Sequence, residues 1–279
     1  MDSSVERAVP TIGQIVRSCR AARGKSQLHL ALEAGISSRH LSFIETGRSK
    51  PSREMVVTLA ETLEVPLRER NAWLAAAGYA ALYRETPLDA PRMSEVRAAV
   101  RYVLDAHGPN PAFAFNRRYD VVMRNDAAAA VVAFFAPAWR GSDNFIELLA
   151  SPDGLRGSVE GWADVVAYGI DRLKRELSRS STDGADGADD ALLQRLAVVE
   201  RQLPRSPRAP AIPAPAIVVP MRFHRDGVVL EFFTTITTLG TPLDITLQEL
   251  RIETFFPATP STRKVLDAIV AGTDRQLAR

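Results

Sequence analysis

The stretch from Gln27 to Glu45 constrains the fold of this chain more than any other part of it. Ala31 is a small residue within an amphipathic pattern, and Gly35 follows four positions later, where a tight turn needs a positive φ angle. Ser37 is in place to cap a second helix. Three apolar residues recur at helical spacing and fasten that helix to the first one: Ile36, Leu41 and Ile44. The pattern favours a helix-turn-helix over the alternative, an ordinary helical hairpin.

Helical signals continue on both sides of this stretch. Thr11 and Gln14 form a capping box at the start of a first helix. Further helices are expected over about 26–34, 37–46, 51–63 and 67–77, with Ser, Gly or Pro at their ends. The sequence therefore predicts a multi-domain chain that begins with an all-α five-helix domain over residues 1–83. Pro87 and Pro91 mark residues 84–92 as a linker.

The remainder, residues 93–279, mixes helical and strand patterns. Helices are expected over 95–106, 126–135, 158–177, about 191–203 and 262–271. Strands rich in Val, Ile, Thr and Phe are expected over 112–115, 120–124, 217–224, 228–238 and 247–256, with Asp226-Gly227 as a hairpin turn. Residues 178–190 and the proline-rich 204–215 are expected to form a solvated loop and an extended connector. These elements predict an α+β domain with an antiparallel sheet.

Positive charge is concentrated at the beginning of the chain. Residues 1–53 carry nine basic and four acidic residues, a balance of +5, so the remaining residues sum to −3 within the net charge of +2. A basic head of this kind favours a polyanionic partner. The longest uncharged apolar run, 127–139, is too short for a bilayer, and the first residues lack the pattern of a signal peptide. With its single cysteine, the chain is expected to be cytoplasmic, without disulfides and without membrane contact.

In a helix-turn-helix, the first turn of the second helix enters the major groove of DNA. Arg39 is the best candidate for reading bases, because a guanidinium grips guanine O6 and N7 together. Ser38 and Ser42 suit adenine or phosphate, and His40 is left open between reading a base and packing or contacting the DNA backbone. Four basic residues are better suited to phosphate, which positions the domain without reading sequence: Lys25, Arg48, Lys50 and Arg53. One such domain covers half an operator, so we expect a homodimer on near-palindromic double-stranded DNA.

Residues 11–79 resemble the Xre/Cro-type helix-turn-helix family, with the run Ile44-Glu-Thr-Gly-Arg-Ser-Lys-Pro-Ser52 as part of the likeness. The resemblance implies that Gln27 contacts a phosphate and that the start of the recognition helix, from Ser37, reads bases. It also implies that Arg20 of the first helix pairs with Glu45 of the recognition helix.

The downstream region resembles the MmyB-like regulators. The likeness rests on three segments: Asn116-Arg-Arg-Tyr-Asp-Val-Val122, Leu239-Gly-Thr-Pro-Leu-Asp-Ile-Thr-Leu247 and Glu249-Leu-Arg-Ile-Glu-Thr-Phe-Phe-Pro257. It implies a PAS-like fold, a sheet with helices on one face, enclosing an apolar ligand that is a fatty acid in some members. The candidate ligand-binding residues are Phe113, Phe115, Arg118, Met123, Phe134, Trp162 and Phe232, with Arg118 or Arg117 at the mouth for a carboxylate. Core packing is the alternative role for each apolar one.

No catalytic pattern accompanies these residues. The four histidines lack metal-ligand spacing, and residues 183–190 lack the terminal Glu of a calcium loop. Glu249 and Glu253 are expected on one charged strand face. We therefore expect a ligand-sensing DNA-binding regulator that is not an enzyme and has no metal or cofactor. Two alternatives stay open: a DNA-binding regulator whose second domain is only a dimerisation platform without a ligand, and an enzyme fused to its own regulator.

Overall fold

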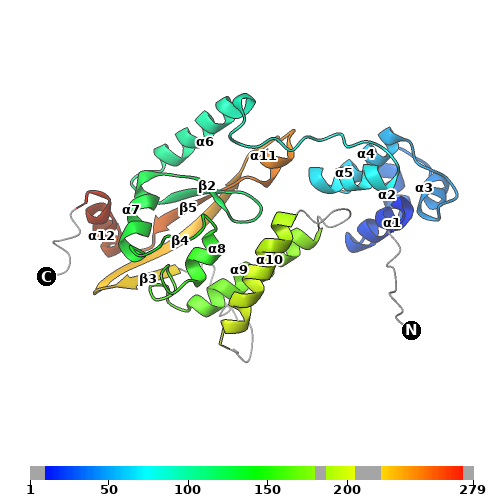
Figure 1. The fold of residues 1–279 in the computed structure, drawn as a ribbon. Coiled ribbons are helices and arrows are strands. Elements are labelled where there is room, and N and C mark those ends of the chain that lie inside the picture. Colours follow the sequence, from blue (N-terminus) through cyan, green and yellow to red (C-terminus); the bar gives the residue numbers. More distant parts are fainter. Residues whose placement is uncertain (1–9, 180–186, 205–220, 273–279) are drawn as a thin grey trace. The chain divides into compact units, whose positions relative to one another are not determined.

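A computed structural model describes residues 10–179, 187–204 and 221–272 of the chain (Figure 1). These residues divide into two compact units. The first holds residues 10–85 together with Arg179 and the segment 242–248. The second holds 86–178, 187–241 without the undescribed gap, and the residues from Glu249 onward. Each unit is a fold in its own right.

The described residues 10–85 of the first unit form five helices, as the sequence predicts. They are α1 (Ile12–Ala22), α2 (Gln27–Glu33), α3 (Ser38–Glu45), α4 (Arg53–Thr62) and α5 (Leu67–Ala76). The first four begin at a residue whose side chain accepts a hydrogen bond from the first turn: Thr11, Ser26, Ser37 and Ser52. The capping box of Thr11 and Gln14 is present. Gly35 has a φ angle of 67°, as the tight turn between α2 and α3 requires.

The core of the first unit joins all five helices around fully buried leucines and isoleucines, including Leu30, Leu41 and Leu59. Ala31 and Ile44 lie in this core as expected. Gly13 marks a close approach that the sequence did not single out. A Cβ atom added there would overlap the backbone carbonyl oxygen of Ile44, so only glycine allows α1 to lie this close to α3.

The second unit is built on a five-stranded antiparallel sheet in the order β2-β1-β5-β4-β3. The strands are β1 (Ala112–Phe115), β2 (Val121–Arg124), β3 (Met221–Arg225), β4 (Val228–Thr238) and β5 (Arg251–Pro257). The helices are η1 (Pro91–Met93), α6 (Ser94–Ala106), α7 (Asp126–Phe135), α8 (Phe145–Ala150), α9 (Trp162–Arg179), α10 (Gly187–Gln202) and α12 (Pro260–Val270), while α11 (Ile245–Glu249) runs from the first unit into the second. Asp226-Gly227 forms the predicted hairpin turn, with both φ angles positive.

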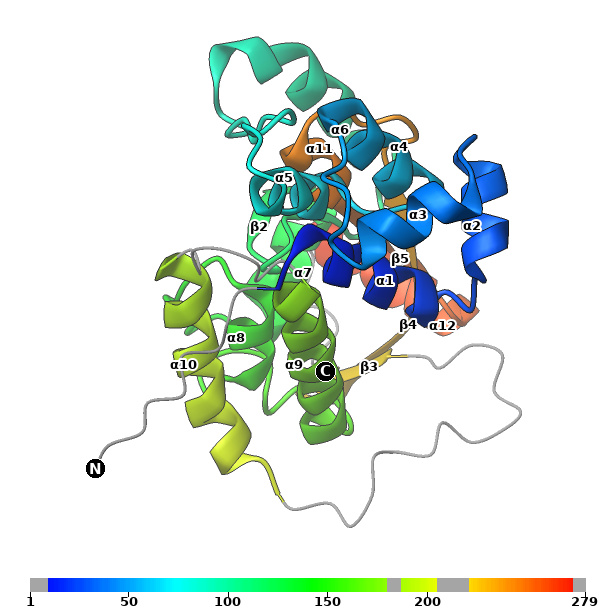
Figure 2. The same cartoon turned by 90° about the vertical axis from the view of Figure 1, so that its right-hand side faces the viewer.

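Helices cover both faces of the sheet, whereas the sequence resemblance implied one. Alternation along β1 divides the two cores, because Phe113 and Phe115 point to one face and Ala112 and Ala114 to the other. The first face packs against α7, α8, α9, α10 and α12, and the second against α6. Figure 1 shows α6 on one side of the sheet and α8, α9 and α10 on the other. Figure 2 shows α9 and α10 side by side, where Lys174 and Glu200 form an ion pair of 2.6 Å.

Three expectations for secondary structure are wrong. Residues 187–190 are the first turn of α10 and not part of a solvated loop, because Asp189 is buried in ion pairs with Arg117 and Arg118. The strand expected from 247 starts at Arg251, since residues 245–249 form α11 instead. Glu249 therefore lies on a helix, and not on one strand face with Glu253. The helix α8 was not predicted. The connector 204–215, beyond Pro204, and residues 217–220 lie outside the described residues.

Candidate DNA-binding surface and apolar cavity

The first turn of α3 is exposed, as a recognition helix requires. The Ser37 hydroxyl accepts a hydrogen bond of 3.1 Å from the His40 amide, which fixes the start of the helix. Ser38 and Arg39 are exposed, and His40 and Ser42 are half-buried. The Arg39 guanidinium lies 5.4 Å from the centre of the Phe43 ring, one helical turn along. This cation–π contact holds the Arg39 side chain along the outer face of α3.

A buried ion pair fixes α3 to α1. Arg20 Nε and Nη2 donate to the two carboxylate oxygens of Glu45 at 2.6 and 2.9 Å, which confirms the predicted pairing. The Glu45 side chain is only 1% exposed and that of Arg20 is 13% exposed. Burial by itself raises the pKa of Glu45. Hydrogen bonds from Arg20 and Gln27, with the charges of Arg20 and Arg17, outweigh it and hold this pKa below its ordinary value of 4.5.

Gln27 belongs to the same network. Its side-chain amide donates a hydrogen bond of 2.7 Å to Glu45 Oε2. This bond orients the side chain at the first position of α2. The helix start of α2 and the recognition helix are thereby tied to one carboxylate, and Gln27 is half-buried where the sequence expects a phosphate contact.

The basic residues expected at phosphates differ in their surroundings. Arg48, Lys50 and Arg53 are exposed. The Lys50 ammonium lies 5.2 Å from the centre of the Tyr79 ring, whose hydroxyl donates to the Pro51 carbonyl at 3.0 Å. Lys25 instead forms an ion pair with Glu33 at 2.5 Å. Three of the four cations therefore face solvent, Arg48 and Lys50 from the turn between α3 and α4 and Arg53 from the first position of α4.

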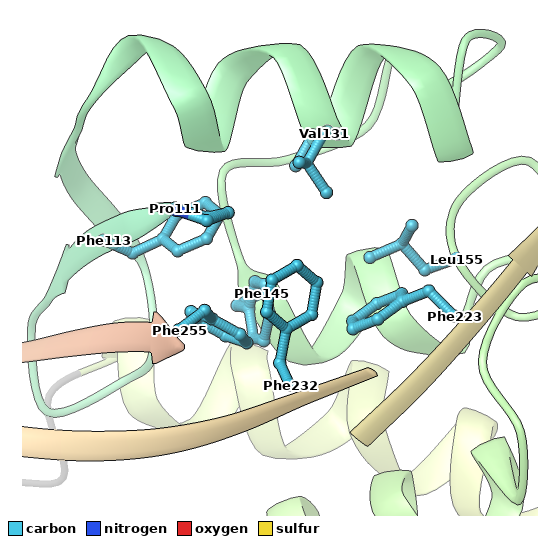
Figure 3. Close-up of a pocket in the computed structure, with 9 residues that line it drawn as sticks. Pro111, Phe113, Val131, Phe145, Leu155, Phe223, Phe232 and Phe255 are labelled. Carbon is cyan, nitrogen blue, oxygen red and sulfur yellow. The ribbon is translucent and has the colours of Figure 1, made fainter. Parts of the chain in front are cut away.

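The second unit contains an apolar cavity of about 20 Å³ between the sheet and α7 (Figure 3). Nine residues line it, and every one is apolar: Pro111, Phe113, Val131, Val132, Phe145, Leu155, Phe223, Phe232 and Phe255. Figure 3 shows the labelled aromatic rings gathered around one space, with Val131 reaching toward it from α7. Of the predicted ligand-binding residues, the structure brings Phe113 and Phe232 together at this cavity.

The other predicted apolar residues lie elsewhere. Phe115 is buried next to the cavity, with its ring 5.2 Å from that of Phe145. Phe134 and Trp162 lie at the edge of the same core, each beside an arginine, with Arg156 only 4.2 Å from the Trp162 ring centre. Met123 packs on the opposite face of the sheet, against the α6 cluster. Met123 pairs with Ala114 of β1 and shares its face of the sheet, whereas Phe113, the next residue along β1, points to the opposite face and the cavity.

Arg117 and Arg118, expected at the mouth of a pocket, are both paired with Asp189 of α10. Arg118 Nη1 lies 3.1 Å from Asp189 Oδ1, and Arg117 Nη2 donates to Oδ2 of the same carboxylate. Arg117 Nε also lies 3.7 Å from Glu249 Oε2. The Arg117 side chain is only 6% exposed, so these carboxylates neutralise a buried charge. In this arrangement the two arginines anchor α10 to the turn after β1.

The sequence did not single out most of the cavity's lining as a site. Phe223, Phe145 and Phe255 were visible as apolar residues, but periodicity did not show that four strands and two helices bring the lining residues to one space. The signal that existed was the alternation along β4 and β5, which places Phe232 and Phe255 on the same face as Phe113. Assigning that face from sequence needed the strand order, which is not local information.

The first unit, with its capped recognition helix, its tight turn and its exposed cations, defines a helix-turn-helix DNA-binding regulator. The helix-turn-helix family model matches residues 16–70. The model for the MmyB-like transcription regulator ligand binding domain matches residues 96–269, more than half of the chain, so the chain belongs to this family. A search among curated proteins found none that matches it. In the described part of the chain, no helix is long and apolar enough to cross a membrane.

Proposed function

We propose that this regulator reads DNA through α3 and binds a small apolar ligand, a fatty acid or a similar molecule, in the cavity of its second unit. It acts by binding and not by catalysis. The observation that carries the ligand half is the lining, in which nine side chains are all apolar. Such a lining favours a hydrocarbon chain, because a polar group there loses its hydrogen bonds to water. The cavity lies within the residues matched by the ligand-binding family model.

Ligand entry has to move side chains. A cavity of about 20 Å³ holds little more than one water-sized group, whereas small-molecule pockets are roughly 300–1,000 Å³. The aromatic rings that separate the sheet from α7 meet edge to face, with interplanar angles of 72° for Phe223–Phe232 and 88° for Phe232–Phe255. We propose that these rings turn aside as the ligand's chain enters between the sheet and α7. The ligand then selects a minor, open arrangement of the unit.

Mass spectrometry of the freshly purified chain tests the ligand half, first under native conditions and then after organic extraction. We expect one apolar acid per protomer. Val131→Phe fills the cavity and should abolish this bound mass, whereas the control Met123→Leu, on the opposite face, should retain it. A bound mass that survives Val131→Phe unchanged, in a folded variant, would place the ligand outside this cavity.

The alternative function is a DNA-binding regulator whose second unit is a dimerisation platform without a ligand. The small volume of the cavity and its close aromatic packing favour this alternative. A dimer with no bound mass, whose DNA affinity does not respond to saturated fatty acids of eight to sixteen carbons, would support it. In that case the aromatic residues serve the core alone.

For the DNA half, we propose that Arg39 reads bases, with Ser38, His40 and Ser42 beside it on α3. The exposed Arg48, Lys50 and Arg53, together with Gln27, contact phosphates. The chain binds as a homodimer to a near-palindromic duplex, because one recognition helix reads only half a site. Selection from a random duplex library tests this, with sedimentation of the protein–DNA complex. Recovered sites with two inverted half-sites and two chains bound are expected, and a single half-site with one chain bound contradicts the dimer.

A further inference from the structure

Helix α5 differs from the other four helices of the first unit in how it begins. Each of the helices α1 to α4 is preceded by a residue whose side chain caps it. Helix α5 follows Pro66, which supplies no such cap. The amide of Leu67, the first residue of α5, instead donates a hydrogen bond of 2.6 Å to Gln248 Oε1. The cap of α5 therefore comes from 181 positions further along the chain.

Gln248 belongs to the segment 242–248, which folds with the first unit although it connects strands β4 and β5 of the second. A second backbone hydrogen bond, of 2.9 Å, joins the Ile245 amide to the Arg84 carbonyl. The Ile245 side chain is only 3% exposed. Two hydrogen bonds thus join this segment to the start of α5 and to Arg84, which follows α5 in the chain.

Residues 82–85, next to this segment, are held by α5 as well. The Asn71 side chain accepts hydrogen bonds from the amides of Leu82 and Tyr83 and donates to the Tyr83 carbonyl at 2.7 Å. Arg84, which accepts the bond from Ile245, follows directly. The surface that receives the segment is thus an ordered part of the first unit, made by the start of α5 and the chain held along it.

The segment is also linked to the cavity through the two strands that it connects. Phe232 on β4 and Phe255 on β5 both line the cavity, and β4 and β5 pair from Phe232↔Pro257 to Thr238↔Arg251. Leu239 and Leu250, at the two ends of the connection, both pack in the α6 cluster of the second unit. The β4–β5 pair therefore carries cavity residues toward the end away from the connection, and the connection itself belongs to the DNA-binding unit.

We propose that the segment 242–248 is an intramolecular docking segment that bears on α5 through the Gln248 cap, so that a change at the cavity wall alters the DNA-binding unit. The part of this inference that concerns ligand control rests on the proposed function. The docking itself does not. A shift of the β4–β5 pair on ligand entry would withdraw the Gln248 cap from α5. Helix α5 packs against α4 and α1, in the same core that holds α3, so a change at its start reaches the recognition helix.

Hydrogen–deuterium exchange on the full-length chain tests the docking without any ligand. In Gln248→Leu, which removes the acceptor, the Leu67 amide should exchange roughly five- to tenfold faster than in the parent. Gln248→Glu keeps an acceptor, and a carboxylate suits a helix N-terminus, so it should retain the protection. The matched control is Leu243→Ser on the same segment, because Leu243 is 86% exposed. Unchanged Leu67 exchange in Gln248→Leu would overturn the docking.

A second measurement tests the coupling, again without a ligand. Phe232→Leu alters the cavity wall directly, and DNA affinity is measured on a duplex selected with the parent protein. We expect Phe232→Leu to change this affinity by roughly fivefold or more in the parent background, and to change it little once Gln248→Leu is present. An equal effect in both backgrounds, or none in the parent, would overturn the coupling. Failure of fatty acid binding alone leaves both measurements intact and refutes only the proposed ligand.

Discussion

The Arg20–Glu45 pair is expected to hold the recognition helix in place, and removing one partner should destabilise the first unit because the other charge is left buried and unpaired. Glu45→Ala removes two short hydrogen bonds to Arg20 and one from Gln27. It leaves the guanidinium, 13% exposed, with the Lys25 carbonyl at 2.8 Å as a remaining acceptor. Removing one partner of a buried pair costs about 3–5 kcal/mol, a large part of a domain's total stability of roughly 5–15 kcal/mol. We expect a loss in the range of about 3–5 kcal/mol for the first unit.

Trp73 provides the assay, because it is buried in the first unit and the other two tryptophans, Trp139 and Trp162, lie in the second. In a Trp139→Phe/Trp162→Phe background, tryptophan fluorescence during urea unfolding reports on the first unit alone. Replacing both charges by apolar residues, Arg20→Met with Glu45→Met, should cost much less than Glu45→Ala, because no buried charge is left unpaired. A double-variant cycle then gives the coupling between the two side chains.

The same pair predicts how the effect depends on pH. The folded-state pKa of Glu45 lies below its ordinary value of 4.5. The contribution of ionised Glu45 to the free energy of unfolding is therefore fully present above the unfolded-state pKa, near 4.5, and is lost as the pH falls through the folded-state pKa. The cost of Glu45→Ala should shrink in that acidic range. Glu33→Ala, at the exposed Lys25–Glu33 pair, is the control and should barely move the midpoint. A cost for Glu45→Ala below about 1 kcal/mol, unchanged by pH, would refute the reasoning.

Three further outcomes are expected. Arg39→Ala should relax sequence preference, whereas Lys50→Ala should weaken cognate and random duplex alike; equal losses on both duplexes for Arg39→Ala would contradict its role in base reading. Gly13→Ala should destabilise the first unit by about 1–3 kcal/mol in the Trp73 assay, since a Cβ overlaps a backbone oxygen of α3; a neutral result would show that α1 and α3 separate freely. Asp189→Ala should expose α10 to faster amide exchange, because Arg117 and Arg118 lose the carboxylate that joins them to α10; unchanged exchange there would argue against that anchor.

The parts of the fold that the sequence predicts are those encoded by neighbouring residues. Ser37 and Gly35 set a cap and a turn within one stretch, so α2 and α3 follow from local pattern. The strand β4 was predicted over its full length because nine of its eleven residues are Val, Ile, Phe or Thr, which favour strands. The Arg20–Glu45 pair came from family resemblance and is confirmed by the structure, since position alone does not show that two helices meet there.

The parts that the sequence did not predict depend on contacts between distant residues. Asp189 lies in an Asp- and Gly-rich run that indicates a solvated loop, yet its carboxylate neutralises Arg117, 72 positions earlier. Residues 247–250 were predicted as the start of a strand, but 247–249 lie in α11, where the Gln248 side chain accepts a hydrogen bond from the distant Leu67 amide. Similarly, Phe113 and Phe232, predicted as ligand-binding residues, line the cavity, whereas Met123 lies on the opposite face, because only the sheet register decides which face each one occupies.

The distant origin of the α5 cap has a consequence for how the first unit folds during synthesis. Synthesis runs from the N-terminus, so α1 to α5 emerge long before Gln248, which caps α5 from 181 residues away. Helices α1 to α5 can therefore fold at first only with α5 uncapped. The Gln248–Leu67 hydrogen bond can form only after β4 and the segment behind it have been synthesised. A fragment that stops at residue 85 keeps the chain in that early state permanently. The DNA affinity of such a fragment then describes a DNA-binding unit without the Gln248 cap, and not the unit of the full-length chain.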